Sequence, residues 1–152
     1  MSDFIRCGSG TVVPAWIDAN GHMNMSHHLA VCDAAVDRLF EQADLGPAAL
    51  AAKGWALVAS RVAMSFRGEL RQGDAYDVDC GVSACGPQGV AVVCRIRSGA
   101  ALRSVCELLI AGLDCTARSR RLLDTETLAA VSRIAVPGLR TPFDSLTGAD
   151  GS

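Results

Sequence analysis

The sequence predicts an α+β fold, in which an antiparallel sheet of about five strands wraps around one long central helix. The helix is predicted because apolar residues between 26 and 45 recur every three or four positions. After Gly54 the apolar period changes to two, which is typical of half-buried strands. Only short turns separate these strands, and short connections favour antiparallel neighbours. The three observations together put a single helix against one face of a meander.

The segment before the helix is expected to be mostly irregular. Residues 1–9 should form a loose lead-in, and a short strand should follow at 11–14, where Pro14 restricts it to a sheet edge or a strand end. The helix is expected at 26–45, because Gly46-Pro47 is a stop signal for a helix. The apolar stripe of this helix consists of Leu29, Cys32, Val36, Leu39, Phe40 and Ala43.

The rest of the chain is expected to complete the sheet and then leave it. The four further strands are expected at 58–67, 76–82, 90–97 and 102–113. Asp124 or Thr125 could cap a short helix after them, and the proline- and glycine-containing end should be mobile. Residues 1–125 are therefore expected to form one domain, and residues 126–152 a short helix and a flexible tail.

The composition restricts the classes of partner and the compartment. A chain of 152 residues with a formal net charge of −2 gives no reason to expect nucleic acid or a membrane as a partner. No apolar run approaches the roughly 20 residues of a membrane span, and the first four residues lack the features of a signal peptide. The seven cysteines are scattered without a C-x-x-C spacing, which fits a reducing compartment. We therefore expect a cytoplasmic protein.

A polar loop directly before the helix is the candidate for chemistry. It contains Asp18, Gly21, His22 and Asn24 just ahead of the helix start. The first backbone N–H groups of a helix lack intrahelical acceptors, and the helix dipole favours negative charge there. A reaction that builds up an oxyanion could use this position. Asp18 would supply the attack and the helix amides would receive the developing charge.

The motif V-x-x-W-I-D-x-N-G-H-M-N, followed by a helix and a meander, resembles the hotdog-fold acyl-CoA thioesterases of the 4-hydroxybenzoyl-CoA thioesterase type. It is most similar to the D-x-N-G-H-M-N branch that includes betainyl-CoA thioesterases. The resemblance implies that Asp18 is the catalytic aspartate and that residues 21–25 form the turn into the helix. It implies that the backbone N–H near Met25 polarises the thioester carbonyl. It also implies no metal and no bound cofactor, with coenzyme A only as part of the substrate, and active sites between two protomers.

Asp18, His22 and Asn24 form the predicted catalytic group, and each also has a structural interpretation. Asp18 could form an Asx turn or cap the helix, although Asn24 and Ser26 lie nearer to the helix start. His22 could be the general acid for the departing thiolate, or it could support the loop geometry. Asn24 could donate to the oxyanion, but its simpler role is that of the helix cap.

A second group is assigned to substrate binding. It comprises Gly21, Met23, Met25, His28, Asp33, Arg120 and Arg121. His28 lies toward the edge of the apolar stripe and could line a pocket, whereas His27 should face solvent; relatives usually carry a tyrosine early in this helix. Asp33 could bind a cationic acyl group or position water, or it could be a surface charge. Arg120 and Arg121 could hold the phosphates of coenzyme A or form a solvated cluster.

The predicted function is hydrolysis of a small or medium acyl-CoA to the free acid and coenzyme A. Asp18 would either attack the carbonyl or activate water. Two alternatives remain, an enoyl-CoA hydratase of the same fold and a non-catalytic acyl-CoA-binding protein. Hydratases of this fold use D-x-N-P-x-H, with the histidine five residues after the aspartate, whereas His22 follows Asp18 by four. The unpaired sheet edge beside the site predicts a homodimer or a dimer of dimers.

Overall fold

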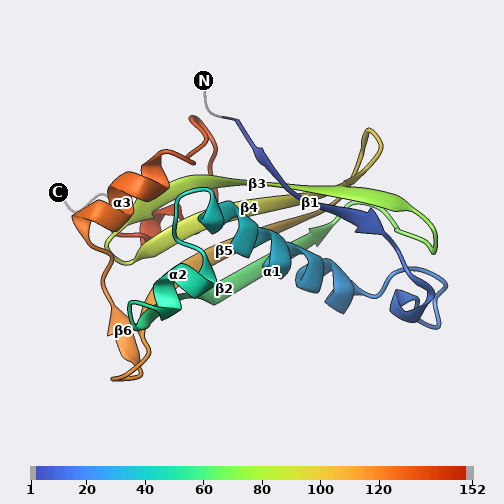
Figure 1. Cartoon of the computed structure of the whole chain (residues 1–152). Coiled ribbons are helices and arrows are strands. Elements are labelled where there is room, and N and C mark those ends of the chain that lie inside the picture. The colour runs from blue at the N-terminus through green and yellow to red at the C-terminus, as the bar shows by residue number, and fades with distance from the viewer. Residues whose placement is uncertain (1–2, 150–152) are drawn as a thin grey trace.

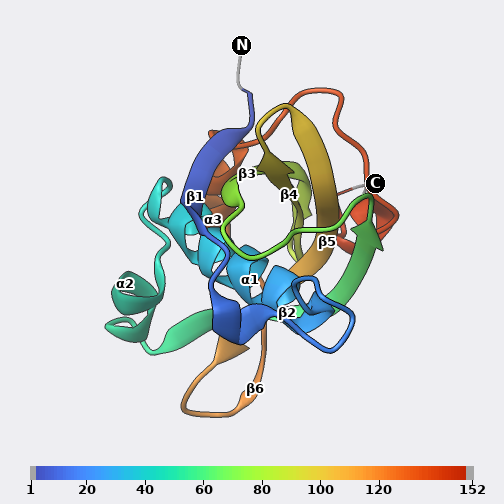
Figure 2. The same cartoon turned by 90° about the vertical axis from the view of Figure 1, so that its right-hand side faces the viewer.

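The computed structural model describes residues 3–149, in which a six-stranded antiparallel sheet curves around helix α1 (Met25–Glu41; Figures 1 and 2). The strands are β1 (Ile5–Thr11), β2 (Trp55–Phe66), β3 (Ala75–Gly86), β4 (Gly89–Ser98), β5 (Ala101–Asp114) and β6 (Ser119–Arg121). The shorter helices are η1 (Pro14–Trp16), α2 (Pro47–Ala51), α3 (Thr125–Ser132) and η2 (Asp144–Leu146). The antiparallel sheet is as predicted, but it has six strands rather than about five, because β6 folds back onto the end of β5.

The strand order is β1-β3-β4-β5-β2, so β1 and β2 are the two edges of the sheet. Of the predicted meander, the part formed by β3, β4 and β5 is present, but the expected hairpin between the strands at 58–67 and 76–82 is wrong. β2 precedes this meander in the chain but pairs with its last strand, from Trp55 opposite Asp114 to Phe66 opposite Ser104. The meander is thus extended on both sides by strands that are distant in sequence.

The first strand begins earlier than the sequence predicted. Gly8 and Gly10 belong to β1 rather than to a loose lead-in, because this segment pairs with β3, and glycine is needed at both positions because side chains of other elements lie close. A Cβ atom on Gly10 would lie 2.6 Å from the Tyr76 hydroxyl, and one on Gly8 would lie 3.2 Å from the Arg38 guanidinium. The strand expected at 11–14 is corrected accordingly, since Pro14 begins the short 3-10 helix η1.

Helix α1 packs its apolar stripe against the concave face of the sheet (Figure 2). Its buried side chains are His28, Cys32, Ala35, Val36, Leu39 and Phe40. They meet the inward residues of the meander, which include Val78, Cys80, Val92, Cys94, Ile96, Cys106 and Leu108. Leu29, which the spacing put in the stripe, is exposed. The helix ends at Glu41 rather than at 45, because Asp44 adopts a left-handed conformation with φ 59° that turns the chain toward α2.

Strand β2 carries an apolar edge that α1 leaves uncovered. Its register shifts between Ala59 and Arg61, so the single alternation predicted from Val58 onward is interrupted by a bulge. Beyond the bulge, Val62 and Phe66 lie at the open edge of the sheet and are 43% and 49% exposed. Large apolar side chains on an unpaired strand edge favour pairing with another strand.

The segment after β6 packs against the sheet. The Val136 N–H donates to the Val82 carbonyl at 2.8 Å, and the Ser83 hydroxyl donates to the Asp144 carboxylate at 2.6 Å. The expected tail after α3 is therefore packed against the sheet through residue 149, and its Thr147 is fully buried. Residues 150–152 of that expected tail lie outside the described residues. No helix in residues 3–149 has the length and apolar character needed to cross a membrane.

Candidate active site

The loop between η1 and α1 is a tight hydrogen-bonded turn. The Asp18 N–H donates to the His22 carbonyl at 3.2 Å, and the Gly21 N–H donates to the Asp18 carbonyl at 3.0 Å. Gly21 has a φ of 83°, a conformation that glycine adopts without steric cost. The chain thus reverses within the motif, so that Asn24 begins the helix within hydrogen-bonding distance of the Asp18 side chain.

Two donors fix the carboxylate of Asp18. The Asn24 side-chain amide donates to Oδ2 at 3.0 Å, and the Asn20 backbone N–H donates to Oδ1 at 2.9 Å. The second contact is the Asx turn that the sequence offered as the structural alternative. The bond from Asn24, and then the bond from Asn20, lower the pKa of the Asp18 carboxyl below its ordinary value of 3.8. At neutral pH the loop therefore holds an oriented, ionised carboxylate.

The first turn of α1 leaves the Met25 backbone amide available to a ligand. Asn24 is the helix cap, since its Oδ1 accepts from the Ser26 N–H at 3.0 Å and from the Ser26 hydroxyl at 2.8 Å. The His27 N–H donates to the Asn24 carbonyl at 3.0 Å. Within residues 3–149, the Met25 N–H has no hydrogen-bond acceptor. Because Asn24 both caps the helix and binds Asp18, it joins the carboxylate to the end of the helix that carries this amide.

An open pocket of about 460 Å³ lies between this helix end and the edge of β2. It is lined by His22, Met23, Met25, His28, Phe66, Arg67, Gly68 and Glu69. The His22 imidazole borders it, with Nε2 3.9 Å from the Glu69 carboxylate and Nδ1 3.4 Å from the Met23 carbonyl. Met25 is 68% exposed at its mouth, whereas Met23 belongs to the core and is only 2% exposed.

His28 is the buried polar residue of this pocket. Its Nδ1 lies 2.9 Å from the Ser104 hydroxyl, and its ring meets the Phe66 ring edge-on at 5.2 Å between centroids. Burial lowers the pKa of His28 below its ordinary value of 6.5, so the imidazole is neutral at pH 7. With Nδ1 engaged by Ser104, Nε2 is the nitrogen that remains for a ligand.

The structure brings together one part of the residues predicted from the sequence. The residues gathered at the start of α1 are Asp18, Gly21, His22, Met23, Asn24, Met25 and His28. Asp33 is two turns further along α1, exposed beside a pocket that faces α2. Arg121 stacks on Trp55 at 4.4 Å near the other end of the helix, and Arg120 donates to the Gln88 carbonyl at 2.9 Å. Since α1 has 17 residues and is therefore about 25 Å long, these arginines are remote from Asp18 within one chain.

Sequence reasoning missed several residues at the site. His27 was expected to face solvent, but it is half-buried and stacks on Trp16 with 5.5 Å between ring centroids. Ser104 was missed as the partner of His28, although a hydroxyl inside the apolar run 102–113 was a usable signal. Phe66 was recognised only as a strand residue, because nothing local indicates that it meets His28 across the fold.

Comparison with known proteins agrees with this architecture. The sequence matches the thioesterase-like superfamily over residues 12–137, from the segment before the motif to the segment after α3. The chain belongs to the thioesterase-like superfamily. In its hotdog-like thioesterase fold the loop of residues 18–24 lies at the start of the long helix α1, with the curved sheet around that helix (Figure 2).

Solved structures resemble this thioesterase-like chain in fold. The protein SAV2348 from Staphylococcus aureus, solved in complex with CoA, has a TM-score of 0.82 at 16% identity, covering 95% of this chain and 93% of its own. Slr0204 from Synechocystis, a 1,4-dihydroxy-2-naphthoyl-CoA thioesterase, has a TM-score of 0.72 at 16% identity, covering 86% and 97%. YbaW from Escherichia coli, a probable thioesterase, has a TM-score of 0.71 at 11% identity, covering 85% and 98%. A search of curated protein sequences gives no significant match.

Proposed function

We propose that this protein is an acyl-CoA thioesterase of the 4-hydroxybenzoyl-CoA type, in the branch marked by D-x-N-G-H-M-N. The observation that carries the proposal is the Asp18 carboxylate, which is bound by the cap residue of α1 next to the free Met25 N–H. The CoA bound to the Staphylococcus aureus protein and the CoA thioester named for the Synechocystis protein support a CoA thioester as the substrate.

Hydrolysis needs a group that attacks or activates water and a group that receives the negative charge. The Asp18 carboxylate either attacks the thioester carbonyl, forming a mixed anhydride, or takes a proton from an attacking water. In both routes the carbonyl oxygen becomes an oxyanion, which the Met25 N–H and the helix dipole stabilise. One such donor lowers the barrier by about 3 kcal/mol. The thiolate of coenzyme A then leaves with the electrons of the broken C–S bond.

The proposed contact between Arg121 and coenzyme A requires a second copy of the chain. β2 runs from Trp55, beneath Arg121, to Phe66, beside His28. Antiparallel pairing of β2 with β2 of a second copy would bring Arg121 of that copy toward the His28 end of the pocket. The two arginines, which are remote from Asp18 within one chain, would then reach the site from the neighbour.

The two sheet edges differ in a way that supports pairing through β2. Both edge strands contain a bulge and an exposed arginine, Arg6 in β1 and Arg61 in β2. Only β2 adds large exposed apolar side chains, which are Val58, Val62 and Phe66, and such side chains favour pairing with another strand. We therefore propose a homodimer, or a dimer of dimers, with active sites at the β2 edge.

A thiol-release screen tests the proposed reaction. Aliphatic, aromatic and betaine-like acyl-CoA esters are offered in turn, while the absorbance of a 2-enoyl-CoA reports hydration in parallel. Thiol release without hydration is expected. Hydration without thiol release would favour the hydratase alternative, and binding without either reaction would favour the non-catalytic one.

Subunit complementation tests the shared site. Asp18→Asn and Arg121→Glu are each expected to be weakly active alone at limiting acyl-CoA. If the two groups come from different copies, mixing and refolding equal amounts makes half of the dimers mixed, each with one intact site, and restores about a quarter of the activity. No recovery in refolded mixtures that contain mixed dimers would refute the shared site.

A further inference from the structure

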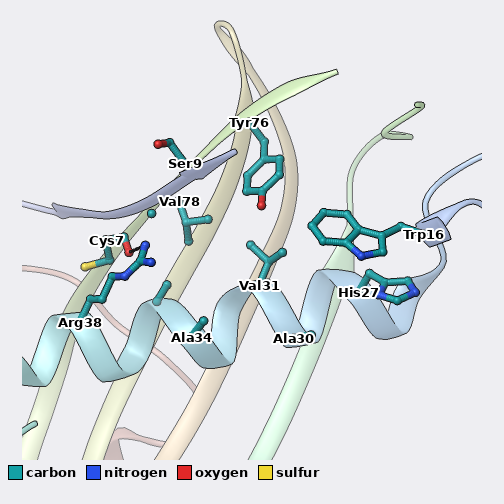
Figure 3. Close-up of a pocket in the computed structure, with 12 residues that line it drawn as sticks. Cys7, Ser9, Trp16, His27, Ala30, Val31, Ala34, Arg38, Tyr76 and Val78 are labelled. Atoms are coloured by element: carbon teal, nitrogen blue, oxygen red, sulfur yellow. Dashed lines mark hydrogen bonds between the residues drawn. The ribbon is translucent and has the colours of Figure 1, made fainter. Parts of the chain in front are cut away.

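A second groove lies on the opposite side of α1 from the His28 pocket, between this helix and strands β1 and β3 (Figure 3). It has a volume of about 290 Å³. The groove exists because Ala30 and Ala34 present only methyl groups where longer side chains would fill the space. Val31 and Val78 add apolar walls on the helix side and the sheet side. The proposed hydrolysis uses none of these residues.

Aromatic side chains form the end of this groove that is nearer to the catalytic loop. Trp16 stacks on His27, and the Trp16 and Tyr76 rings lie 6.2 Å apart between centroids. The Trp16 carbonyl accepts from the Asn24 N–H at 2.9 Å, so this end is continuous with the loop that carries Asp18. Flat rings with hydrophobic faces favour an aliphatic chain or another ring as ligand.

A cation lies at the other end. The Arg38 side chain rises from α1 toward β1, and its Nη1 donates to the Cys7 carbonyl at 3.1 Å (Figure 3). Gly8 allows this approach, since a Cβ there would lie 3.2 Å from Nη1. Within residues 3–149, no carboxylate oxygen lies within 4.0 Å of the Arg38 guanidinium. The guanidinium has five N–H donors, so most remain for an anion.

We propose that this groove binds an amphiphilic carboxylate, with its apolar body between Trp16, Val31 and Tyr76 and its anionic end on Arg38. His27 and Arg38 are eleven residues apart on α1, which gives the groove a length of about 16 Å. An apolar cavity of about 150 Å³ accepts a benzene ring, so 290 Å³ suits an acyl chain or an aryl group with an extension. A guanidinium and a carboxylate form charge-assisted hydrogen bonds.

Two sources can supply such a ligand, a free carboxylic acid or the distal carboxylate of the acyl group of a thioester. Binding of a free acid needs no catalysis and is independent of the proposed hydrolase activity. Binding of an acyl group with a distal carboxylate rests on that activity, because the thioester must then be a substrate.

A fluorescence titration tests the binding site. Trp55→Phe leaves Trp16 as the remaining tryptophan, and octanoate is the probe, with 1-octanol as the uncharged equivalent. Octanoate is expected to change the Trp16 emission saturably. Its dissociation constant for Arg38→Met should be about tenfold higher, because this variant lacks the charged hydrogen bond. Arg38→Lys should retain most of the affinity. Calorimetric titration of the unaltered protein gives a second readout that does not depend on the Trp55 substitution.

Matched variants test whether a loss of octanoate binding comes from the groove itself or from a general effect of substitution. Ala34→Leu should abolish octanoate binding by filling the groove, whereas Ala48→Leu, on the exposed side of α2, should not. Arg140 is an exposed arginine whose Nη1 donates to the Leu139 carbonyl at 3.3 Å, and Arg140→Met should bind octanoate like the parent. Absence of saturable binding, or equal affinity in folded Arg38→Met, would overturn the proposal.

Kinetics then distinguish the two sources of ligand. Tetradecanedioyl-CoA is long enough to span the groove from the reacting carbonyl to Arg38, and it differs from tetradecanoyl-CoA only in the distal carboxylate. A lower KM for tetradecanedioyl-CoA that Arg38→Met removes would assign the groove to the acyl group. Equal KM values, together with octanoate binding, would assign it to a free acid. Octanoate binding without any thioester hydrolysis would refute the proposed function and leave the groove standing.

Discussion

Replacement of Asp18 by asparagine tests the centre of the proposed mechanism. The carboxylate now accepts two hydrogen bonds, one at each oxygen, from Asn24 and Asn20. An asparagine has one oxygen and one NH₂ group, so it can accept only one of these bonds and must turn a donor toward the other. The loop should therefore keep one anchor and lose the negative charge that attacks or takes a proton.

The rate should fall far more than the stability. Loss of a positioned base lowers rates by about a hundredfold to ten-thousandfold, so kcat of Asp18→Asn should fall at least about a hundredfold. KM should change little, because binding of the ground state does not require this charge. Thiol release under saturating acyl-CoA measures kcat, and thermal unfolding reports whether the loop still supports the fold.

Asp114→Asn is the matched control for this substitution. The Asp114 Oδ1 also accepts two bonds, from the backbone N–H groups of Thr116 at 2.9 Å and Ala117 at 2.8 Å, but it lies at the β5–β6 turn. Both variants should lose a little thermal stability, and only Asp18→Asn should lose turnover. A folded Asp18→Asn protein that hydrolyses its substrate at nearly the parent rate would refute the mechanism.

Three further predictions follow from the same contacts. Asn24→Ala removes the main cause of the lowered Asp18 pKa. Activity is lost as pH falls through that pKa, so the acid limb of the pH profile of kcat/KM should move to higher pH. Loss of the helix cap should also lower the free energy of unfolding in urea by about 1 kcal/mol. Burial lowers the pKa of His28, so the unfolded chain takes up a proton first and the free energy of unfolding should fall as pH drops below 6.5. His28→Phe should flatten this pH dependence, measured by urea unfolding. Val62→Glu on the β2 edge should shift the light-scattering mass toward the monomer and lower activity, whereas Val13→Glu, at a site that is also 41% exposed, should do neither.

The helix and the meander could be predicted because their signals are local. The apolar spacing on α1 and the alternation on β3 and β4 report which face is buried, and the turns report antiparallel pairing. Asp18 and Asn24 could be associated because they are only six positions apart in a loop that contains Gly21.

The remaining features depend on contacts between distant parts of the chain. In the sequence, Gly8 and Gly10 look like residues that interrupt a strand. The reason for glycine at these positions is the close approach of Arg38 and Tyr76, which come from other elements. The bond between His28 and Ser104 spans 76 positions, and no periodicity reports it. Nor could the sequence show that Arg121 lies at the far end of α1, since that follows from where β6 folds back onto β5.

The strand order also determines when the active site can form during folding. β3, β4 and β5 are joined by tight turns, so they can pair early. β2 and β1 pair with more distant strands, since Trp55 and Asp114 are 59 positions apart and Ile5 and Cys80 are 75 positions apart. Pairings with long loops pay a larger closure entropy and form slowly. The Asp18 loop lies between β1 and α1, so its geometry depends on late docking of both. A chain synthesised from its N-terminus thus carries the Asp18 loop from the start but orders it only after the meander has left the ribosome.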